Sequence, residues 1–466
     1  MNTLLQFDPA LLRRYDRPGP RYTSYPSALR FRPDFTETDL RRHAARSNEE
    51  PIPRDLSLYI HVPFCFSPCF YCGCNRLITR DTSRGAPYAE RLLREAELLS
   101  RLFVRDREVA QVHFGGGTPN FLDAPTLRGL IDGLARDFRF SARADRDFSI
   151  ELDPRSVRTG DIAAYAGMGF NRASFGVQDF DRQVQLAINR EQSVAQTLEA
   201  LEECRASGFR SVNVDLIYGL PRQTVAGFRR TLDIIADARP DRVAVYGYAH
   251  LPQMFKAQRQ IVEQDLPDAA ARLDLLQAAI ERLTDAGYVY IGLDHFALPD
   301  DELSRALEAG SLQRNFMGYT THAACDLIGL GVSAISHVGD SFSQNHRELA
   351  AWEVAVDQGR LPLHRGLTLD DDDVIRADVI QELMCNGAID RAGIAARYDI
   401  DFDEYFADAL VQLAPLAEDG LVESSAERIV ATSRGRLMLR IIAMCFDRYL
   451  STQPASATGP RHSHAL

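Results

Sequence analysis

Short apolar runs alternate with amphipathic helical patterns along most of this chain, from about residue 57 onward. In one helical pattern, Leu92, Ala96, Leu99 and Phe103 recur at i, i+4, i+7 and i+11. The candidate strands are Leu58–Val62, Val109–Phe114, Phe148–Leu152, Arg172–Gly176, Ser211–Tyr218, Arg242–Tyr248 and Tyr288–Leu293. Repeated strand–helix units with buried strands imply a parallel sheet, so the pattern predicts an α/β fold.

Six or seven such units form a full or partial (β/α) barrel, in which function lies on the loops after the strands. Polar groups do collect there: the second to sixth strands carry or precede Gly115–Pro119, Glu151, Gly176–Asp179, Asp215 and Tyr248–His250. Strand ends are polar in most proteins, but that does not account for an acidic or amide residue at so many of them. We therefore expect one site built from many loops.

A dense cysteine cluster follows the first strand. Four of the eight cysteines lie between Cys65 and Cys74, and the first three are spaced C-x3-C-x2-C at Cys65, Cys69 and Cys72. Three nearby thiolates favour an iron–sulfur cluster or zinc. If only three ligate, one metal position stays open for chemistry. A structural zinc knuckle and a redox dithiol are the alternatives at this point.

Composition narrows the class of protein. The chain has 53 basic and 65 acidic residues, a net charge of −12. This balance argues against nonspecific binding to nucleic acid or to an anionic membrane, which requires a basic face. The first residues lack a signal-peptide pattern, and no apolar run approaches the ~20 residues that span a bilayer. We expect a cytoplasmic protein, where clustered cysteines stay reduced and bind metal.

Four regions are expected along the chain. Residues 1–50 form an N-terminal arm or lid, in which the proline-rich stretch Pro18–Pro26 favours a surface arm. Residues 51–364 form the barrel domain. Residues 365–452 form a mainly helical, winged-helix-like C-terminal domain without a basic recognition face, and 453–466 form a disordered tail.

The cysteine spacing, with an aromatic residue before the last cysteine, resembles that of the radical S-adenosylmethionine enzymes. Within that superfamily the chain resembles the oxygen-independent coproporphyrinogen III oxidase (dehydrogenase) family over nearly its whole length. The motifs that carry this resemblance are Arg21–Pro26, Tyr59–Cys65, Tyr71–Asn75, Gly115–Pro119, Gly176–Phe180, Asn189–Gln192, Asp215–Pro221 and Gly331–Ile335.

The resemblance implies a set of residue roles. Cys65, Cys69 and Cys72 hold one [4Fe–4S] cluster, and Cys74 lies close by without being a ligand. Two S-adenosylmethionine molecules bind; the first is contacted by Tyr59, Gly116, Glu151 and Ile335, and the second by Tyr71, Gly117, Thr118, Gln178, Arg190, Asp215 and Ala249. Cys74 and Tyr59 are the expected catalytic residues. Arg21, Lys256 and Arg314 are candidates for binding the substrate's propionates.

The resemblance also implies a reaction. A 5′-deoxyadenosyl radical generated at the cluster removes a hydrogen from the propionates of rings A and B of coproporphyrinogen III. Loss of CO2, with transfer of the remaining electron to an acceptor, leaves vinyl groups and gives protoporphyrinogen IX for haem biosynthesis. An electron donor such as flavodoxin or ferredoxin is implied, and we expect a monomer that binds neither nucleic acid nor membrane.

Two other classes compete with this prediction. The related radical-enzyme-like haem chaperone binds haem instead of oxidising a porphyrinogen, but its cysteine loop lacks the counterpart of Cys74 and its chain lacks the Arg21–Pro26 segment. A structural or interaction protein that holds zinc is the second class. Iron with acid-labile sulfide would distinguish the oxidase from the zinc protein.

Overall fold

The computed structural model describes residues 5–322 and 325–451. They divide into two compact units that are each assembled from separate stretches of chain. The larger unit consists of residues 31–283 and 325–368, and the smaller of 5–30, 284–322 and 369–451. The domain limits expected from the sequence stay predictions, and the expected tail 453–466 lies outside the described residues.

Seven parallel strands form the centre of the larger unit. Their order is β9-β8-β7-β6-β4-β1-β14. Their bounds are β1 Leu56–Val62, β4 Glu108–Gly116, β6 Asp147–Leu152, β7 Arg172–Gln178, β8 Ser211–Tyr218, β9 Arg242–Gly247 and β14 Asp326–Leu330; the short β5, Arg139–Phe140, flanks β4. The first six candidate strands are therefore confirmed. The seventh, β10 (Val289–Gly292), instead pairs antiparallel with β11 (His295–Ala297) in the smaller unit.

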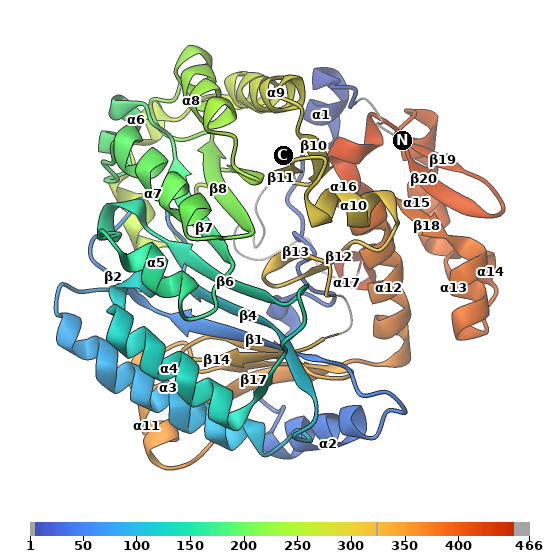
Figure 1. The fold of residues 1–466 in the computed structure, drawn as a ribbon. Coiled ribbons are helices and arrows are strands. Elements are labelled where there is room, and N and C mark those ends of the chain that lie inside the picture. The colour runs from blue at the N-terminus through green and yellow to red at the C-terminus, as the bar shows by residue number, and fades with distance from the viewer. Residues whose placement is uncertain (1–4, 323–324, 452–466) are drawn as a thin grey trace. The chain divides into compact units, whose positions relative to one another are not determined.

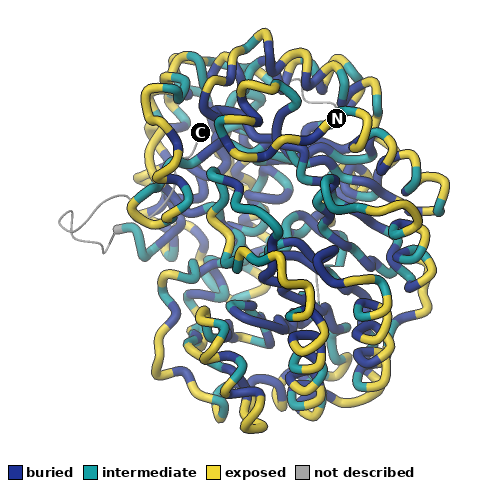
Figure 2. Tube along the Cα trace, turned by 90° about the vertical axis from the view of Figure 1, so that its left-hand side faces the viewer, coloured by how far each residue is buried: buried dark blue, intermediate teal, exposed yellow. Residues whose placement is uncertain are grey.

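Amphipathic helices cover the outer side of these strands (Figure 1). They are α3 Gly85–Ser100, α4 Ala124–Asp137, α5 Asp161–Ala166, α6 Arg182–Ala187, α7 Val194–Ala206, α8 Val225–Ala238 and α9 Ala269–Asp285. In α3, Leu92 and Ala96 are fully buried and Leu99 nearly so, as the helical spacing predicts. Burying each leucine contributes roughly 1.5–3 kcal/mol. Figure 2 shows the resulting pattern of buried strands and exposed outer helical turns.

The parallel sheet continues into an antiparallel extension that the sequence pattern did not predict. After β14 come β15 (Ile335–His337), β16 (Ser341–Asn345) and β17 (Leu363–Thr368), each antiparallel to its neighbour. Helix α2 (Glu37–Asn48) contacts β16, and α11 (Leu349–Asp357) contacts α3. The Gly331–Ile335 segment leads from β14 into this extension.

A fully buried carboxyl group supports that segment. Glu95 of α3 accepts hydrogen bonds from the backbone N–H of Gly331 at 2.9 Å, from Asn345 Nδ2 at 2.6 Å and from Trp352 Nε1 at 3.0 Å. Burial outweighs these donors and raises the pKa of Glu95 to about 7. Trp352 is itself fully buried, as expected of a packing residue.

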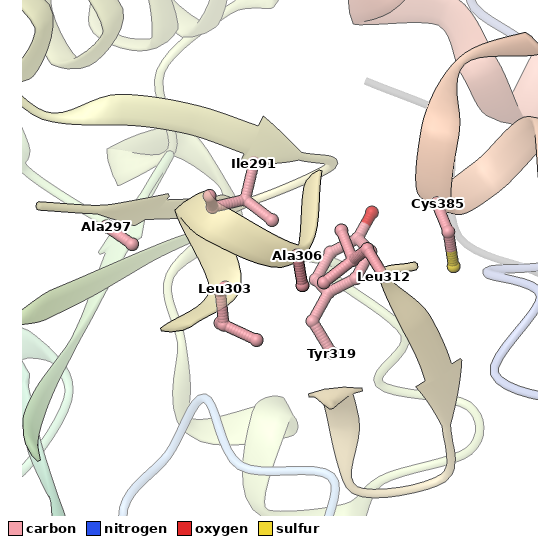
Figure 3. Packing of buried hydrophobic residues seen from close by; sticks show 7 residues of the cluster. All are labelled: Ile291, Ala297, Leu303, Ala306, Leu312, Tyr319 and Cys385. Carbon is pink, nitrogen blue, oxygen red and sulfur yellow. The ribbon is translucent and has the colours of Figure 1, made fainter. Parts of the chain in front are cut away.

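The smaller unit is mainly helical. Its helices are α1 Pro9–Tyr15, α10 Glu302–Glu308, α12 Asp371–Asn386, α13 Arg391–Tyr398, α14 Phe402–Tyr405, α15 Ala407–Glu418, α16 Leu439–Met444 and α17 Arg448–Ser451. Two small antiparallel sheets accompany them: β12 Gln313–Asn315 with β13 Gly318–Thr320, and β18 Ala388–Asp390, β20 Arg428–Ala431 and β19 Val422–Ser424 in that order. Figure 3 shows one of its apolar cores, in which Tyr319, Leu312 and Cys385 pack with residues of β10, β11 and α10.

The proline-rich segment near the N-terminus is not the surface arm that we expected. Tyr22 and Tyr25 are buried within the smaller unit. The Tyr22 hydroxyl donates to Asp447 Oδ2 at 3.1 Å, and the Tyr25 hydroxyl accepts from the N–H of Arg448 at 3.2 Å. The buried Arg440 guanidinium donates to the carbonyls of Gly19 and Pro20. Tyrosine burial, which proline content does not reveal, therefore fixes this segment against the last helices of its own unit.

The fold class expected from the sequence is confirmed: a central parallel sheet of the partial-barrel type and a helical C-terminal part. No helix among the described residues is long and apolar enough to cross a bilayer.

Candidate active site

A small two-stranded sheet frames the cysteine loop. β2 (Phe64–Cys65) pairs in parallel with β3 (Leu77–Ile78), so the segment between them projects as a loop from the C-terminal end of β1. The Arg76 guanidinium donates to the carbonyls of Cys72 at 2.9 Å and Cys69 at 3.0 Å, which holds the loop's backbone in place. Cys65 and Cys69 are buried, Cys72 is half-buried and Cys74 is exposed.

Each sulfur of the C-x3-C-x2-C motif accepts hydrogen bonds. Cys65 Sγ accepts from the Thr118 hydroxyl at 3.4 Å, and Cys72 Sγ accepts from the N–H of Cys74 at 3.4 Å. The interaction with Cys74 is the main influence that lowers the pKa of the Cys72 thiol to about 6, whereas burial raises the pKa of Cys65 to about 11. Donors directed at sulfur stabilise the thiolate form, which is the form that binds metal.

Polar side chains line the inner face of the parallel sheet in adjacent rows. Tyr59 of β1 is in register with His113 of β4, which is in register with Ser149 of β6. Two residues along β6, Glu151 is in register with Ser174 of β7. Side chains two residues apart on a strand share a face, so these polar groups all point to one side.

Glu151 is held by two donors. Its Oε1 lies 3.1 Å from His113 Nε2, and its Oε2 accepts from the backbone N–H of Gly116 at 3.1 Å. Burial raises the pKa of Glu151, but the hydrogen bonds from His113 and Gly116 outweigh burial and hold that pKa below its ordinary value. Glu151 is therefore an ionised carboxylate at neutral pH, suited to a cationic ligand group.

A second carboxyl group, on β8, differs in its protonation. Asp215 accepts from Ser174 Oγ at 3.1 Å and from Asn213 Nδ2 at 2.8 Å. Burial is the main cause that raises the pKa of Asp215 to about 6, and the nearby Glu151 adds to the shift. Asp215 is thus ionised at neutral pH but becomes protonated in mild acid.

A group of charged residues surrounds Cys69. Asp153 follows β6 and pairs with Arg155 at 2.6 Å and with Arg190 at 3.3 Å. Burial raises the pKa of Asp153, but Arg190 and then Arg155 hold it below its ordinary value. Arg190 also donates to the carbonyl of Gly176 at 2.6 Å, and its Nε is buried with no hydrogen-bond partner among the described residues. That unpaired donor suits an anionic ligand group.

One open pocket of about 250 Å³ brings most of the predicted site residues together. Its lining includes Cys65, Cys69, Cys72, Cys74, Tyr71, Gly116, Gly117, Thr118, Glu151, Gln178, Arg190 and Asp215. Close packing explains why position 117 of the lining is a glycine, since a Cβ on Gly117 would lie 2.7 Å from the Pro63 carbonyl. Gly116 has a φ of +109°, a conformation that favours glycine.

Three predicted residues do not line this pocket. Tyr59 stacks on His113 with ring centroids 5.8 Å apart, and its hydroxyl lies 3.0 Å from His61 Nδ1. Ile335 begins β15 and lies against the backbone of Gly329, since a Cβ on Gly329 would stand 2.5 Å from the Ile335 carbonyl oxygen. Gly329 of β14 is the register partner of Tyr59 in β1. Ala249 follows β9.

Two of the three propionate candidates are already engaged within the smaller unit. Arg21 forms an ion pair with Asp294. Arg314 donates to the carbonyl of Arg21 at 2.6 Å and lies over the Tyr319 ring at 5.5 Å. Lys256, which begins a 3₁₀ turn in the larger unit, is exposed.

Three residues at the site were missed from the sequence. His113 precedes Gly115 by two residues, so its place on the same face of β4 could have been inferred from strand alternation. Arg155 directly follows the Asp153-Pro154 pair and donates to Cys69. Gln258 donates to the carbonyls of Tyr71 at 2.8 Å and Ala249 at 3.1 Å, and no local pattern indicates this link.

Comparison with known proteins agrees with this geometry. The model of the Radical SAM superfamily matches residues 59–235, and that of the HemN C-terminal domain matches residues 369–438. The chain is 48% identical over 446 residues, 96% of each chain, to the oxygen-independent coproporphyrinogen III oxidase of Pseudomonas aeruginosa. The chain belongs to the oxygen-independent coproporphyrinogen III oxidase family.

Other members of the oxygen-independent coproporphyrinogen III oxidase family agree with this assignment. The Escherichia coli enzyme is 47% identical over 96% of each chain. The solved structure of coproporphyrinogen III oxidase (HemN) from Escherichia coli, described as a radical SAM enzyme, has a TM-score of 0.91 to this chain at 46% identity. That match covers 96% of this chain and 99% of the other. The predicted family and its class of enzyme are thereby confirmed.

Enzymes of this radical class use a [4Fe–4S] cluster and S-adenosylmethionine, as the sequence predicted. The donor set fits a cluster: three cysteine sulfurs at one pocket, each accepting hydrogen bonds, next to a carboxylate and an arginine with an unpaired N–H. Among the described residues, no group of three His, Cys, Asp or Glu side chains is arranged to hold a single metal ion. A cluster of this kind attaches each cysteine to a different iron.

Proposed function

We propose that this protein converts coproporphyrinogen III to protoporphyrinogen IX without oxygen, by oxidative decarboxylation of the propionates on rings A and B. The observation that carries this proposal is the single pocket in which Cys65, Cys69 and Cys72 meet Glu151 and Arg190. The family to which the chain belongs supports the choice of substrate.

The residues of the pocket divide into three roles. Cys65, Cys69 and Cys72 hold the cluster, and Arg76 holds their loop. Glu151 accepts from the ammonium group of S-adenosylmethionine, because it is an ionised carboxylate next to the backbone of Gly116. When bound, the cluster and S-adenosylmethionine supply a carbon radical that removes hydrogen from the propionate chain.

A second S-adenosylmethionine molecule is part of the proposal. Arg190 pairs with its carboxylate through the guanidinium N–H that lacks a protein partner. Asp215 accepts from a ribose hydroxyl, and Tyr71 presents an aromatic face to the adenine. Tyr71 is well placed for this because it packs on the apolar cluster that contains Ile217, Leu220 and Tyr248.

The remaining site residues complete the two contact sets. Gly116, Tyr59 and Ile335 join Glu151 at the first molecule; Gly117, Thr118, Gln178 and Ala249 join Arg190 and Asp215 at the second. Cys74, which is exposed in the cysteine loop, and Tyr59 are proposed to act on the substrate.

We propose that the protein works in the cytoplasm as a monomer and receives electrons from a small carrier such as flavodoxin or ferredoxin. The net charge of −12 supports the absence of nucleic-acid and membrane partners.

The test is an anaerobic incubation of the protein carrying its cluster with a reductant, S-adenosylmethionine and coproporphyrinogen III, followed by chromatography and mass spectrometry. We expect the successive loss of two CO2 and two pairs of hydrogen atoms from the substrate, with formation of 5′-deoxyadenosine. A cluster-bearing protein that binds haem and leaves coproporphyrinogen III unchanged would instead identify a haem chaperone.

A further inference from the structure

Cys69 differs from the other two cysteines of the motif in the charge of its partners. Its Sγ accepts from Arg190 Nη1 at 3.4 Å and from Arg155 Nη2 at 3.7 Å. Cys65 and Cys72 accept instead from a neutral hydroxyl and a neutral backbone N–H. Two guanidinium groups are therefore directed at one of the three sulfurs.

The geometry of Arg155 is fixed by its neighbours. It lies in the 3₁₀ turn Pro154–Ser156 directly after β6, and Asp153 caps that turn by accepting from the N–H of Arg155 at 3.1 Å. The Asp153 carboxylate also accepts from Arg155 Nε at 3.0 Å and from Arg155 Nη2. A side chain held by its own turn in this way keeps its N–H directed at the sulfur.

The charges of the group do not cancel. Arg155 and Arg190 share the single carboxylate of Asp153, which leaves one net positive charge beside Cys69. The side chains of Arg190 and Asp153 are only 6% and 12% exposed, so solvent screens this charge weakly. Arg190 has a second task in the proposed function, whereas Arg155 lines the same pocket but is given no task there.

Hydrogen bonds to cluster sulfurs and nearby charge are among the factors that set the reduction potential of an iron–sulfur cluster. One-electron reduction adds negative charge to the cluster. A guanidinium N–H on a ligand sulfur withdraws electron density and stabilises the reduced form. A residue with this effect makes it easier for a carrier protein to reduce the cluster.

We propose that Arg155, which also lines the pocket, raises the reduction potential of the cluster through its N–H···S bond to Cys69 and so acts as a tuning residue. This inference rests on the proposed function, because it takes Cys69 as a cluster ligand.

The test is an anaerobic redox titration in which the reduced cluster is followed by electron paramagnetic resonance. The variants are Arg155→Gln, which removes the charge, and Arg155→Lys, which keeps the charge but loses the planar fork. Arg139→Gln is the matched control: it removes one positive charge at β5, beside the start of β4, roughly 25 Å of strand away from Gly116.

We expect the midpoint potential to move to more negative values in Arg155→Gln, to move less in Arg155→Lys, and to stay unchanged in Arg139→Gln. A potential equal to that of the parent in Arg155→Gln, with full iron and sulfide content, would overturn the inference. If Arg155→Gln does not assemble a cluster, Arg155→Lys decides: a shifted potential supports the inference, and the parent value overturns it. A parent protein without iron and sulfide would instead reject the proposed function.

Discussion

The carboxylate of Glu151 joins two parts of the site, because its Oε2 accepts from the backbone N–H of Gly116 at 3.1 Å while its Oε1 faces His113. These contacts leave a half-buried negative charge at the pocket that contains the cysteine sulfurs. The glycine-rich turn at the end of β4 and the acid at the end of β6 are thereby joined at one site.

The first prediction concerns this carboxylate. Glu151→Gln keeps the shape of the side chain but removes its charge, so we expect S-adenosylmethionine to bind about 10- to 100-fold more weakly. That factor corresponds to the ~1.5–3 kcal/mol of a hydrogen bond to a charged group. Equilibrium binding to the cluster-bearing protein measures it. Unchanged affinity would remove Glu151 from the binding site.

A second prediction follows from Asp215. Its pKa is raised to about 6 by burial, and it can act as a pure acceptor only when ionised. We expect the affinity for S-adenosylmethionine to fall as the pH drops from 7.5 through 6. Asp215→Asn should bind more weakly at neutral pH and lack this pH dependence between 5.5 and 7.5. A variant that retains the parent's pH profile would show that another group titrates.

The third prediction concerns stability and Glu95. Because the pKa of Glu95 is raised to about 7 in the folded protein, the folded state favours its protonated form. Its contribution to stability is therefore largest in acid and is lost as the pH rises through about 7. Relative to Glu95→Gln, the parent should lose about 2–3 kcal/mol between pH 5 and pH 8.

Thermal unfolding of both proteins across that pH range measures the difference. An equal pH dependence in parent and variant would show that Glu95 is ionised in both the folded and unfolded states.

The fourth prediction concerns the N-terminal segment. Removing residues 1–30 exposes the last helices of the smaller unit. These helices bind Tyr22 and Tyr25, and their Arg440 donates to the carbonyls of Gly19 and Pro20. We expect normal iron content, because the cysteine loop belongs to the larger unit, but a lower melting temperature and no product. Full product formation by the shortened protein would show that the segment is dispensable.

Much of this architecture could be predicted from the sequence because it depends on local patterns. Alternating apolar runs and helical spacing located six parallel strands, and the polar groups at their ends indicated one site. The antiparallel strands β15–β17 were missed because their residues are mostly polar and the strands are held together by pairing with one another, which local patterns do not encode. The seventh candidate strand was apolar enough to predict, but its antiparallel partner depends on a turn at Gly292–His295.

The site shows the same limit at the level of single residues. The cysteines and Glu151 were found because motif spacing and strand ends mark them. Arg155 and Gln258 were missed because their role depends on which atoms they meet across the fold: a sulfur in one case and two carbonyl groups in the other. Only the folded chain reveals such contacts.

The most direct test of the central claim is the iron and acid-labile sulfide content of single cysteine variants purified without oxygen. The account predicts four irons and four sulfides per chain in the parent and in Cys74→Ala, with loss of both in Cys65→Ala, Cys69→Ala and Cys72→Ala. A parent that contains zinc in place of iron and sulfide, or a Cys74→Ala variant that loses the cluster, would contradict it.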